Sequence, residues 1–150
     1  MKILALDPAS QTGWAVNGLA KSYGTWDLKT RKDESIGMKL IRFESKLKEV
    51  VEQMDIQLIV YERPAGRNTY SIIHQSKLIA IAEKYCENNN IQYRAYSASE
   101  IKKHATGKGN CGKPAMIQAA REKLAYAGDN DNEADALWLL DLAMRELNIV

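Results

Sequence analysis

Two carboxylates stand at the ends of two apolar runs in this sequence. Asp7 follows the run "ILAL", and Glu62 follows the run "QLIVY". Apolar runs of this length are typical of buried strands, and ligand sites in open α/β sheets lie at the carboxyl ends of such strands. A lone acid after a strand is more often a turn former or a helix cap. Two such acids on neighbouring strands would repel each other, however, and a divalent metal ion would supply the compensating charge.

A third acidic group lies in the segment "GDNDNEADALWLLDLA" near the end of the chain. On a helix, Asp135 shares a face with Asp131 or Asn132, which precede it by four and three residues, whereas Glu133 points elsewhere. Asp131 and Asn132 are also typical of helix N-termini, where their side chains accept hydrogen bonds from free N–H groups. Capping does not explain Asp135, because it interrupts the apolar side that should pack on the sheet. We therefore expect Asp135 to share a site with Asp7.

The elements that must position these residues follow from alternation and periodicity. We expect five strands, over residues 2–7, 13–16, 22–28, 57–61 and 91–96. We expect helices over 36–54 and 70–87, a short helix from Ser97 or Ser99, one that starts near Pro114, and a last one over 131–147. Ser97 with Glu100 fits a capping box. This order predicts an α/β fold with a mixed five-stranded sheet and helices on both faces, in a single domain of 150 residues.

The composition is typical of a soluble globular protein, with 45% hydrophobic and 27% charged residues and a formal net charge of +2. No apolar stretch approaches the roughly 18 residues that would cross a bilayer, so we expect no membrane partner. The chain starts without the features of a secretory signal, which predicts a cytoplasmic protein, of a bacterium or, if phage-encoded, of its host. Cys86 and Cys111 are too few for a disulfide framework, and we expect free thiols.

The segment "IKKHATGKGNCGKPAM" is the most basic part of the chain. From Ile101 to Arg121 there is no acid, and the basic residues are Lys102, Lys103, Lys108, Lys113 and Arg121. Such a surface could contact the phosphate backbone of DNA, or it could be a solvated loop. The segment also matches G-x-x-x-x-G-K, the start of a P-loop. A P-loop joins a strand to a helix and ends in Ser or Thr, whereas Pro114 follows here, so we expect no nucleotide cofactor.

Three segments resemble the acidic motifs of RuvC-type Holliday junction resolvases, which are part of the ribonuclease H-like superfamily. The segments are "LALDPASQTGWAV", "LIVYERP" and "NEADALWLL", and their order and spacing match over nearly the whole chain. The resemblance implies a ribonuclease H-like fold and a metal-dependent endonuclease that cuts branched DNA, four-way junctions above all. It also implies that Asp7, Glu62 and Asp135 bind two Mg²⁺ ions, for which Mn²⁺ could substitute.

One position departs from the family pattern. Where the family commonly has an acid three residues before the last Asp, this chain has Asn132, preceded by Asp131. Asn132 could coordinate a metal ion through its carbonyl oxygen, or Asp131 could take the role, so the fourth ligand stays open between them. Oxygen ligands of this kind suit Mg²⁺, and two ions about 3.5–4 Å apart can activate a water and stabilise the leaving oxygen of a phosphodiester.

The resemblance also implies which residues contact DNA. The family's lysine before its Thr-Gly turn and its lysine at the start of the next helix correspond to Lys102 and Lys113, and Lys113 could stabilise charge on the scissile phosphate. The family's loop after the fourth strand enters the junction centre with an aromatic that stacks on bases. Here the first aromatic in that region is Tyr70, preceded by Arg63 and Arg67. Stacking of Tyr70 on a base and packing of Tyr70 at the helix start are both open.

The second long helix has apolar residues on more than one face, which predicts a second buried surface. These residues are Ile72, Ile73, Leu78, Ile79, Ile81, Ala82 and Tyr85. A homodimer would provide that surface, and twofold symmetry suits a reaction that needs two matched nicks.

Two alternative functions come from other classes of protein. An actin-like ATPase or sugar kinase also has an acid at the tip of its first strand. Those proteins need two such domains and glycine turns for phosphate, where this chain has Pro8-Ala9-Ser10. The second alternative is a junction-binding protein without cleavage, which is suggested by Asn132 in place of an acid.

Overall fold

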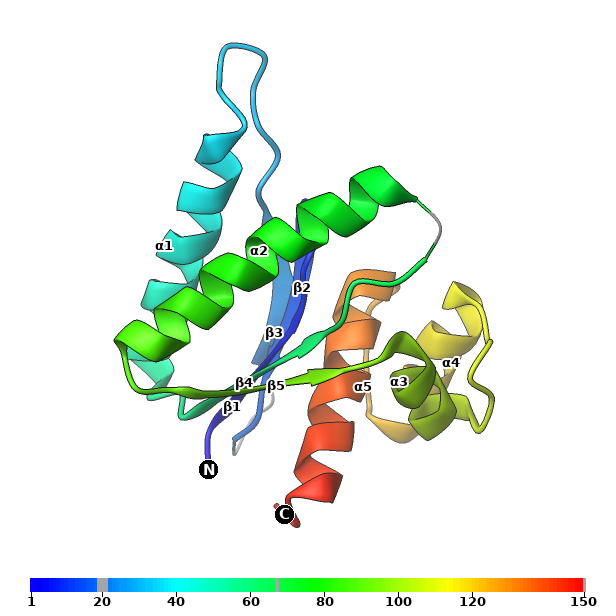
Figure 1. Ribbon diagram of the computed structural model, residues 1–150. Coiled ribbons are helices and arrows are strands. Elements are labelled where there is room, and N and C mark those ends of the chain that lie inside the picture. Colours follow the sequence, from blue (N-terminus) through cyan, green and yellow to red (C-terminus); the bar gives the residue numbers. More distant parts are fainter. Residues whose placement is uncertain (19–21, 67, 150) are drawn as a thin grey trace.

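The computed structural model describes residues 1–18, 22–66 and 68–149. Within these ranges the elements in chain order are β1 (Ile3–Asp7), β2 (Gln11–Val16), β3 (Ser22–Asp27), α1 (Gly37–Met54), β4 (Leu58–Glu62), α2 (Thr69–Asn88), β5 (Gln92–Tyr96), α3 (Ala98–Thr106), α4 (Lys113–Lys123) and α5 (Asp131–Glu146). Figure 1 shows them in three layers, with the sheet between two groups of helices.

The sheet is mixed, in the order β3-β2-β1-β4-β5. β1, β2 and β3 form an antiparallel meander, and β4 and β5 continue the sheet parallel to β1. This arrangement confirms the predicted mixed five-stranded sheet. It also makes β1 and β4 neighbours, which was the condition for their terminal acids to meet.

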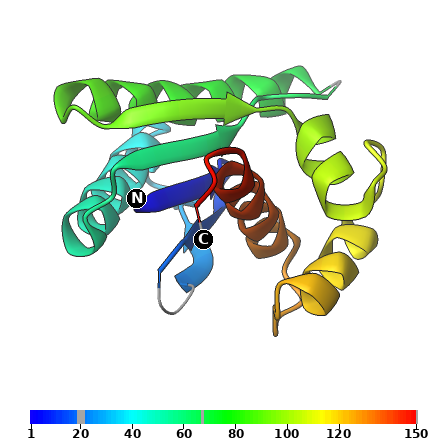
Figure 2. The same ribbon diagram turned by 90° about the horizontal axis from the view of Figure 1, so that it is seen from below.

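Helices cover both faces of the sheet, as predicted (Figure 2). Along β1, Ile3 and Ala5 belong to one core cluster and Leu4 and Leu6 to the other, because successive side chains of a strand point to opposite faces. The first cluster includes residues of α3, α4 and α5, and the second includes residues of α1 and α2. The chain therefore has two cores, one on each side of the sheet.

Several local features agree with the sequence. Ser97 is the N-cap of α3, with its Oγ 3.1 Å from the backbone N–H of Glu100, and Pro114 lies in the first turn of α4. Cys86 and Cys111 are free. None of the helices in the described part of the chain is long and apolar enough to span a membrane.

Every strand differs from its predicted range by one or two residues at one end or both, and two of these differences bear on the site. β2 begins at Gln11 instead of residue 13, because Gln11 and Thr12 pair with the end of β3. β4 includes Glu62, whose partner in the ladder is Tyr96 of β5. The acids Asp7 and Glu62 are thus the last residues of their strands and not the first residues of loops, so the sheet itself holds their backbones.

Candidate active site

Asp7 and Glu62 lie side by side at the carboxyl ends of β1 and β4. The two strands are parallel and in register up to the residues just before the acids. Asp7 shares a face with Ala5, and Glu62 shares a face with Val60, because side chains alternate along each strand. Ala5 and Val60 both belong to the core beneath α5, so both carboxylates are on the α5 side of the sheet.

Asp135 reaches the same place from the second turn of α5. Asp135 lines a pocket of about 350 Å³ together with Glu62, and Lys102 of α3 and Lys113 of α4 line the same pocket. Asp7 lies deeper, with only 9% of its surface exposed. The three sequence motifs therefore meet, and two lysines from the basic segment face them.

A glycine lets α5 approach the sheet closely enough for this meeting. Gly13 of β2 pairs with Asp7 of β1. A Cβ atom at Gly13 would lie 2.0 Å from the backbone oxygen of Asn132, which no side chain could tolerate. The first turn of α5 thus packs directly on the backbone beside Asp7. Gly13 is not among the site residues predicted from the sequence, although a glycine within a strand is a signal of close backbone approach.

The turn after Asp7 is held by Thr12, which is fully buried. Its hydroxyl donates to the backbone oxygen of Ala9 over 2.6 Å and is 3.3 Å from the Ala9 N–H. This pair of contacts closes the turn between β1 and β2, and so fixes the direction in which the chain leaves Asp7.

The polar residues at the start of α5 make different contacts. Asn130 is the N-cap, and its side chain accepts from the backbone N–H of Glu133 over 3.0 Å. The Glu133 carboxylate is 2.8 Å from the Tyr126 hydroxyl, so it points away from the other acids, as predicted. Asp131 is 3.1 Å from Lys113 Nζ. Asn132 lines a different pocket, beside Ala9.

Burial raises the pKa values of Asp7, Glu62 and Asp135, and the charges of neighbouring acids add to this effect for Asp7 and Asp135. Burial raises the pKa of Asp7 well above its ordinary value of 3.8, and the charges of Glu62, Asp135 and Asp131 raise it further. Burial, followed by the charge of Glu62, raises the pKa of Asp135 to about 7. Burial also raises the pKa of Glu62, which Lys102 partly offsets. Nearby like charges in a site of low polarity favour either protons or a bound cation.

The oxygen donors here are of the type that Mg²⁺ prefers. Asp7, Glu62 and Asp135 could hold such an ion, and either Asp131 or Asn132 could add to them. In the described ranges, however, no three Asp, Glu, His or Cys side chains already stand in an arrangement that could hold a metal ion. The residue types are those that bind Mg²⁺, but their side chains do not surround a common point.

Two contacts hold α3 and α4 against α5 and so place the lysines. Trp138 of α5 donates its indole N–H to the backbone oxygen of Met116 in α4, over 3.2 Å. His104 of α3 lies 2.7 Å from Asp141 and packs edge-on against Trp138. The His104 ring is nearly buried in these contacts, so the structure places it in packing between helices, although it belongs to the basic segment.

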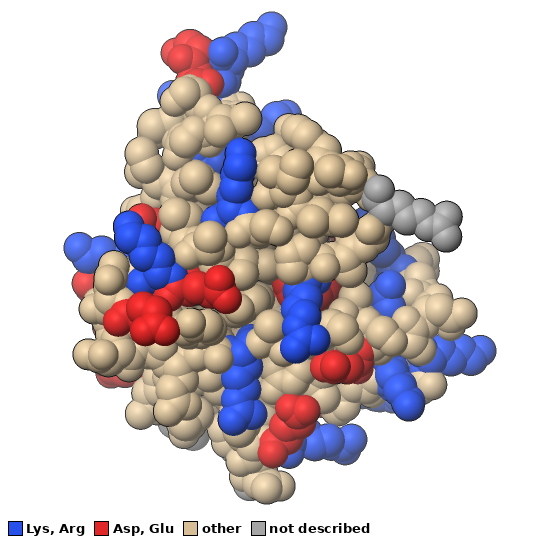
Figure 3. Space-filling model, in the orientation of Figure 1, with Lys and Arg blue, Asp and Glu red and all other residues tan. Residues whose placement is uncertain are grey.

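The other predicted DNA-contact residues that the structure describes are exposed at the surface. Lys103 and Lys108 are exposed in α3 and in the loop after it, and Arg63 is exposed just beyond Glu62. Figure 3 shows basic side chains over α3 and α4, at the right of the view, and a mixture of both charges elsewhere on that face. Tyr70 is 69% exposed in the first turn of α2, so it does not pack into the core. Arg67 lies outside the described residues.

The segment that matches a P-loop start, residues 107–113, connects α3 to α4. A P-loop needs a strand before it and a helix after it. The position of this segment in the fold therefore agrees with the sequence argument against nucleotide binding there.

The apolar residues of α2 pack largely within the chain. Leu78, Ile79, Ala82 and Tyr85 are buried in the core beneath α1 and α2, and Ile81 packs against the same core. Ile73, another of the predicted apolar residues, has 49% of its surface exposed. The two-faced pattern therefore reflects the deep position of α2, and it is weaker support for a dimer than the sequence suggested.

Comparison with solved structures assigns the fold to the ribonuclease H-like class, of the type found in RuvC Holliday junction resolvases. Thermus thermophilus RuvC matches with a TM-score of 0.77 at 17% identity, over 99% of this chain and 97% of that one. The T. thermophilus RuvC complex with a Holliday junction substrate matches with a TM-score of 0.75 at 18% identity, over 93% and 90%. The yeast mitochondrial Holliday junction resolvase Ydc2 matches with a TM-score of 0.67 at 13% identity, over 95% and 78%.

No protein-family model and no curated protein sequence matches this chain. The solved structures therefore confirm the fold that the resemblance of the three acidic motifs implied.

Proposed function

We propose that this protein is a metal-dependent, structure-selective endonuclease that resolves four-way DNA junctions by paired phosphodiester hydrolysis. The observation that carries the proposal is the meeting of Asp7, Glu62 and Asp135 in one site whose pocket is also lined by Lys102 and Lys113. Carboxylates that repel one another beside two lysines suit a site for a cation and a phosphate. The solved RuvC complex with a Holliday junction substrate supports branched DNA as the partner.

In this proposal Asp7, Glu62 and Asp135 hold Mg²⁺, two ions per site, with Mn²⁺ as a substitute. We assign the fourth position to Asp131, because its charge acts on both Asp7 and Asp135, whereas Asn132 lines the neighbouring pocket. The chemistry supplied by the bound ions is activation of a water molecule and stabilisation of the negative charge that develops on the phosphate.

In this proposal Lys113 and Lys102 act on the scissile phosphate. Lys113 is paired with Asp131 and reaches the site from the first turn of α4, so its charge lies where a scissile phosphate would enter. Lys102 lines the same pocket as Glu62 and Asp135, and its charge partly offsets the rise in the pKa of each, which favours the ionised forms that bind a cation. Both lysines stabilise added negative charge in the transition state.

The arms of the junction contact the basic surface around this site. Lys103 and Lys108 are exposed beside the lysines of the pocket, and Arg63 is exposed on the other side of Glu62. Such residues bind phosphates without reading the sequence, and their contribution falls as salt rises. We also propose Arg67 as a DNA-contact residue, on the basis of the sequence alone.

We also propose that the protein acts as a homodimer, because its proposed substrate is symmetric. Resolution of a four-way junction needs two cuts at matched positions, and a closed twofold dimer presents two identical sites in the required relation. The buried packing of α2 neither requires nor prevents this arrangement. No membrane or nucleotide cofactor enters the proposed reaction, and we expect it in the cytoplasm.

A cleavage assay tests the proposal. The protein is incubated with a labelled synthetic four-way junction and with a linear duplex of the same sequence, in Mg²⁺, in Mn²⁺ or in a chelator. We expect paired nicks on the junction alone, only with metal, and loss of at least about 10³-fold in rate for Asp7→Asn.

The matched control is Asp55→Asn. Asp55 is an exposed acid at the end of α1, and its left-handed backbone conformation suits Asn as well as Asp. This variant should cleave like the wild type. Equal cleavage by Asp7→Asn and Asp55→Asn, or equal cleavage of the linear duplex, would contradict the proposal.

Two observations favour a second candidate function, which is binding of junctions without cleavage. The family's usual acid is replaced by Asn132, and the carboxylates do not yet surround a common centre. In the same assay this candidate predicts a shifted junction band in a gel and intact strands under both metals.

A further inference from the structure

The loop between β3 and α1, residues 28–36, is a second basic segment, separate from the one in α3 and α4. Its exposed basic side chains are Lys29, Arg31 and Lys32. In Figure 1 the loop is the part of the chain that extends furthest beyond the sheet, past the first turn of α1. Among the described residues, none of these three side chains forms a salt bridge. Their charges are therefore available to a partner outside the chain.

Strand pairing places this loop at the end of the sheet that carries the acids. Asp7 pairs with Gly13 of β2, and Gln11 at the start of β2 pairs with Asp27 at the end of β3. β5 also finishes at this end, because it is parallel to β4 and β1. The loop after β3 and the basic segment after β5 thus leave the same end of the sheet from its two outer strands, and Asp7 and Glu62 lie between them.

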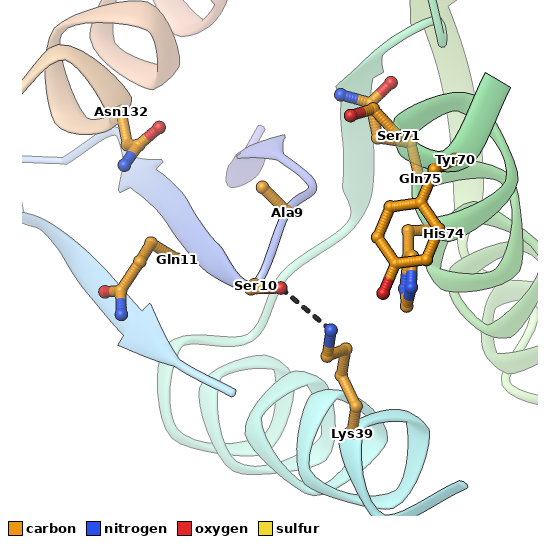
Figure 4. A pocket seen from close by; sticks show the side chains of 9 residues that line it. All are labelled: Ala9, Ser10, Gln11, Lys39, Tyr70, Ser71, His74, Gln75 and Asn132. Carbon is orange, nitrogen blue, oxygen red and sulfur yellow. Dashed lines mark hydrogen bonds between the residues drawn. The ribbon is translucent and has the colours of Figure 1, made fainter. Parts of the chain in front are cut away.

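Hydrogen bonds fix the base of the loop to the turn that follows Asp7. The backbone N–H of Leu28 donates to the backbone oxygen of Ser10 over 2.8 Å. Lys39 of α1 donates from Nζ to the Ser10 hydroxyl, also over 2.8 Å (Figure 4). Leu28 is fully buried in the core beneath α1 and α2, which anchors the chain at that point. The loop is therefore held in a defined position relative to Asp7.

Glu34 holds the other side of the loop. Its carboxylate accepts from the backbone N–H of Arg31 over 2.7 Å and pairs with Arg42 of α1. The hydrogen bond from Arg42 lowers the pKa of Glu34, so this carboxylate is ionised at neutral pH. Because Arg42 balances the charge of Glu34, Asp33 is the one other acid in residues 28–36 that opposes the three basic side chains. The loop keeps an excess of positive charge.

The spacing of the strands relates this loop to positions along a bound strand of DNA. Neighbouring strands of a sheet lie about 4.8 Å apart, so β3 lies about 10 Å from β1. One strand of B-DNA advances about 3.4 Å per nucleotide, so about three nucleotides separate a phosphate at Asp7 from the first one at the loop. This relation takes the scissile phosphate to lie at Asp7, and so it rests on the function proposed above.

We propose that the loop of residues 28–36 binds the DNA backbone about three to five nucleotides from the cut, on the side away from α3 and α4. Lys29, Arg31 and Lys32 contact phosphates there and do not read the bases. A four-way junction has an arm on each side of its crossover. The loop and the basic segment of α3 and α4 therefore hold two different arms when the crossover lies at the acids.

Uncharged phosphates test this contact. A labelled four-way junction carries one methylphosphonate at each position in turn around the cut, and its affinity is measured in chelator, so that binding is observed without cleavage. We expect the affinity of the wild type to fall by about 3-fold or more when the neutral group lies about three to five nucleotides from the cut on one side. The same positions should matter little to a protein whose loop has lost its charges.

The variant that removes these charges is Arg31→Gln combined with Lys32→Gln. We expect it to bind the unmodified junction about 10-fold more weakly, and the slope of log affinity against log salt to decrease by about 2. At the positions that affect the wild type, a neutral phosphate should cost this variant less than about 1.5-fold, because the contact is already absent. Both side chains are exposed, and thermal unfolding verifies that the fold is retained.

The matched control is Lys48→Gln combined with Lys84→Gln. Both lysines are exposed, on α1 and α2, and both lie toward the other end of the sheet. This protein should respond to every neutral phosphate like the wild type. Wild-type affinity of the Arg31→Gln and Lys32→Gln variant, or an unchanged response to the neutral phosphates, would overturn the inference and leave the resolvase proposal standing. Absence of both binding and cleavage for every junction would overturn both.

Discussion

At the scale of single residues, the candidate site is a place where stability and function oppose each other. Asp7 is almost fully buried, next to Glu62 and Asp135, and burial together with the repulsion between carboxylates favours their neutral forms. A core built only for stability would have an apolar residue at Asp7. A cluster of this kind is expected where a bound cation supplies the missing attraction.

The stability of the metal-free protein should fall as pH rises from about 4 to about 7. The pKa of Asp135 is about 7 in the folded protein and near its ordinary 3.8 in the unfolded chain. In this window the folded state binds a proton that the unfolded state has released, so the free energy of unfolding decreases with pH. Urea unfolding in chelator at several pH values measures the slope.

Asp135→Asn is the comparison for this measurement. It removes the titrating group, so it should flatten the slope and stabilise the metal-free protein at pH 8. Adding Mg²⁺ at pH 8 should then raise the melting temperature of the wild type more than that of the variant. Parallel pH curves for the two proteins, with equal responses to Mg²⁺, would show that Asp135 is not part of a charged cluster.

Lys113 should act on the rate of cleavage more than on binding. It is largely exposed and close to Asp131, so Lys113→Met leaves the fold intact but removes a charge from the phosphate. We expect a loss of about 10²–10³-fold in single-turnover cleavage and a loss of less than about 3-fold in junction affinity. Lys48→Met, on the exposed side of α1, is the control. A loss confined to affinity would make Lys113 a binding residue only.

At the scale of elements, the placement of α5 decides the geometry of the site. The helix carries Asp135 and packs on β1 and β2, and α3 and α4 are attached to it through Trp138 and His104. A shift of α5 would therefore move Asp135 and both lysines relative to Asp7. Displacements of about 1 Å are enough to cost an enzyme about 10²-fold in rate.

Gly13→Ala should produce such a shift. The added Cβ would overlap the backbone of Asn132, so the first turn of α5 must move away from β2. We expect cleavage to fall by about 10²-fold or more, with a loss of stability of about 1–3 kcal/mol. Gly37→Ala is the matched control, because a Cβ at Gly37 in the first turn of α1 meets no atom within 4 Å. Full activity of Gly13→Ala would show that the close packing is not needed.

At the scale of the whole molecule, the sheet divides the chain into two unequal layers. The layer of α3, α4 and α5 carries the lysines and Asp135, whereas Lys39 of α1 and Tyr70 of α2 line a pocket together with residues of the β1–β2 turn. The acids at the ends of β1 and β4 lie on the α5 side of the sheet. A DNA strand whose phosphate reaches these acids would therefore contact the layer of α3, α4 and α5.

The proposed homodimer predicts a mass of twice 16.9 kDa in light scattering at micromolar concentration. Ile73, exposed on α2, is the residue through which we test the interface. Ile73→Glu should give the mass of a single chain and replace paired nicks by single, uncoordinated ones. Ile41→Glu, on the exposed side of α1, is the control. A single-chain mass for the wild type, together with paired nicks, would contradict the dimer in solution.

The sequence by itself determined the elements and the residue types of the candidate site. Apolar runs and helical periodicity predicted all five strands and the main helices, because these patterns reflect local geometry and the burial of one face. The alternation of side chains made it possible to expect the meeting of Asp7 and Glu62, provided that their strands were neighbours. The acid motifs also indicated the RuvC-type fold, which the solved structures confirm.

Only the tertiary structure decided how residues distant in sequence meet. The contact of Gly13 with Asn132, the direction of Asp131 toward Lys113, and the pocket beside Gln75 each depend on how a helix lies on the sheet. Local periodicity specifies which face of a helix is apolar, but it leaves the helix free to slide and turn along the sheet. Close packing between side chains removes that freedom, because interiors tolerate neither voids nor overlaps.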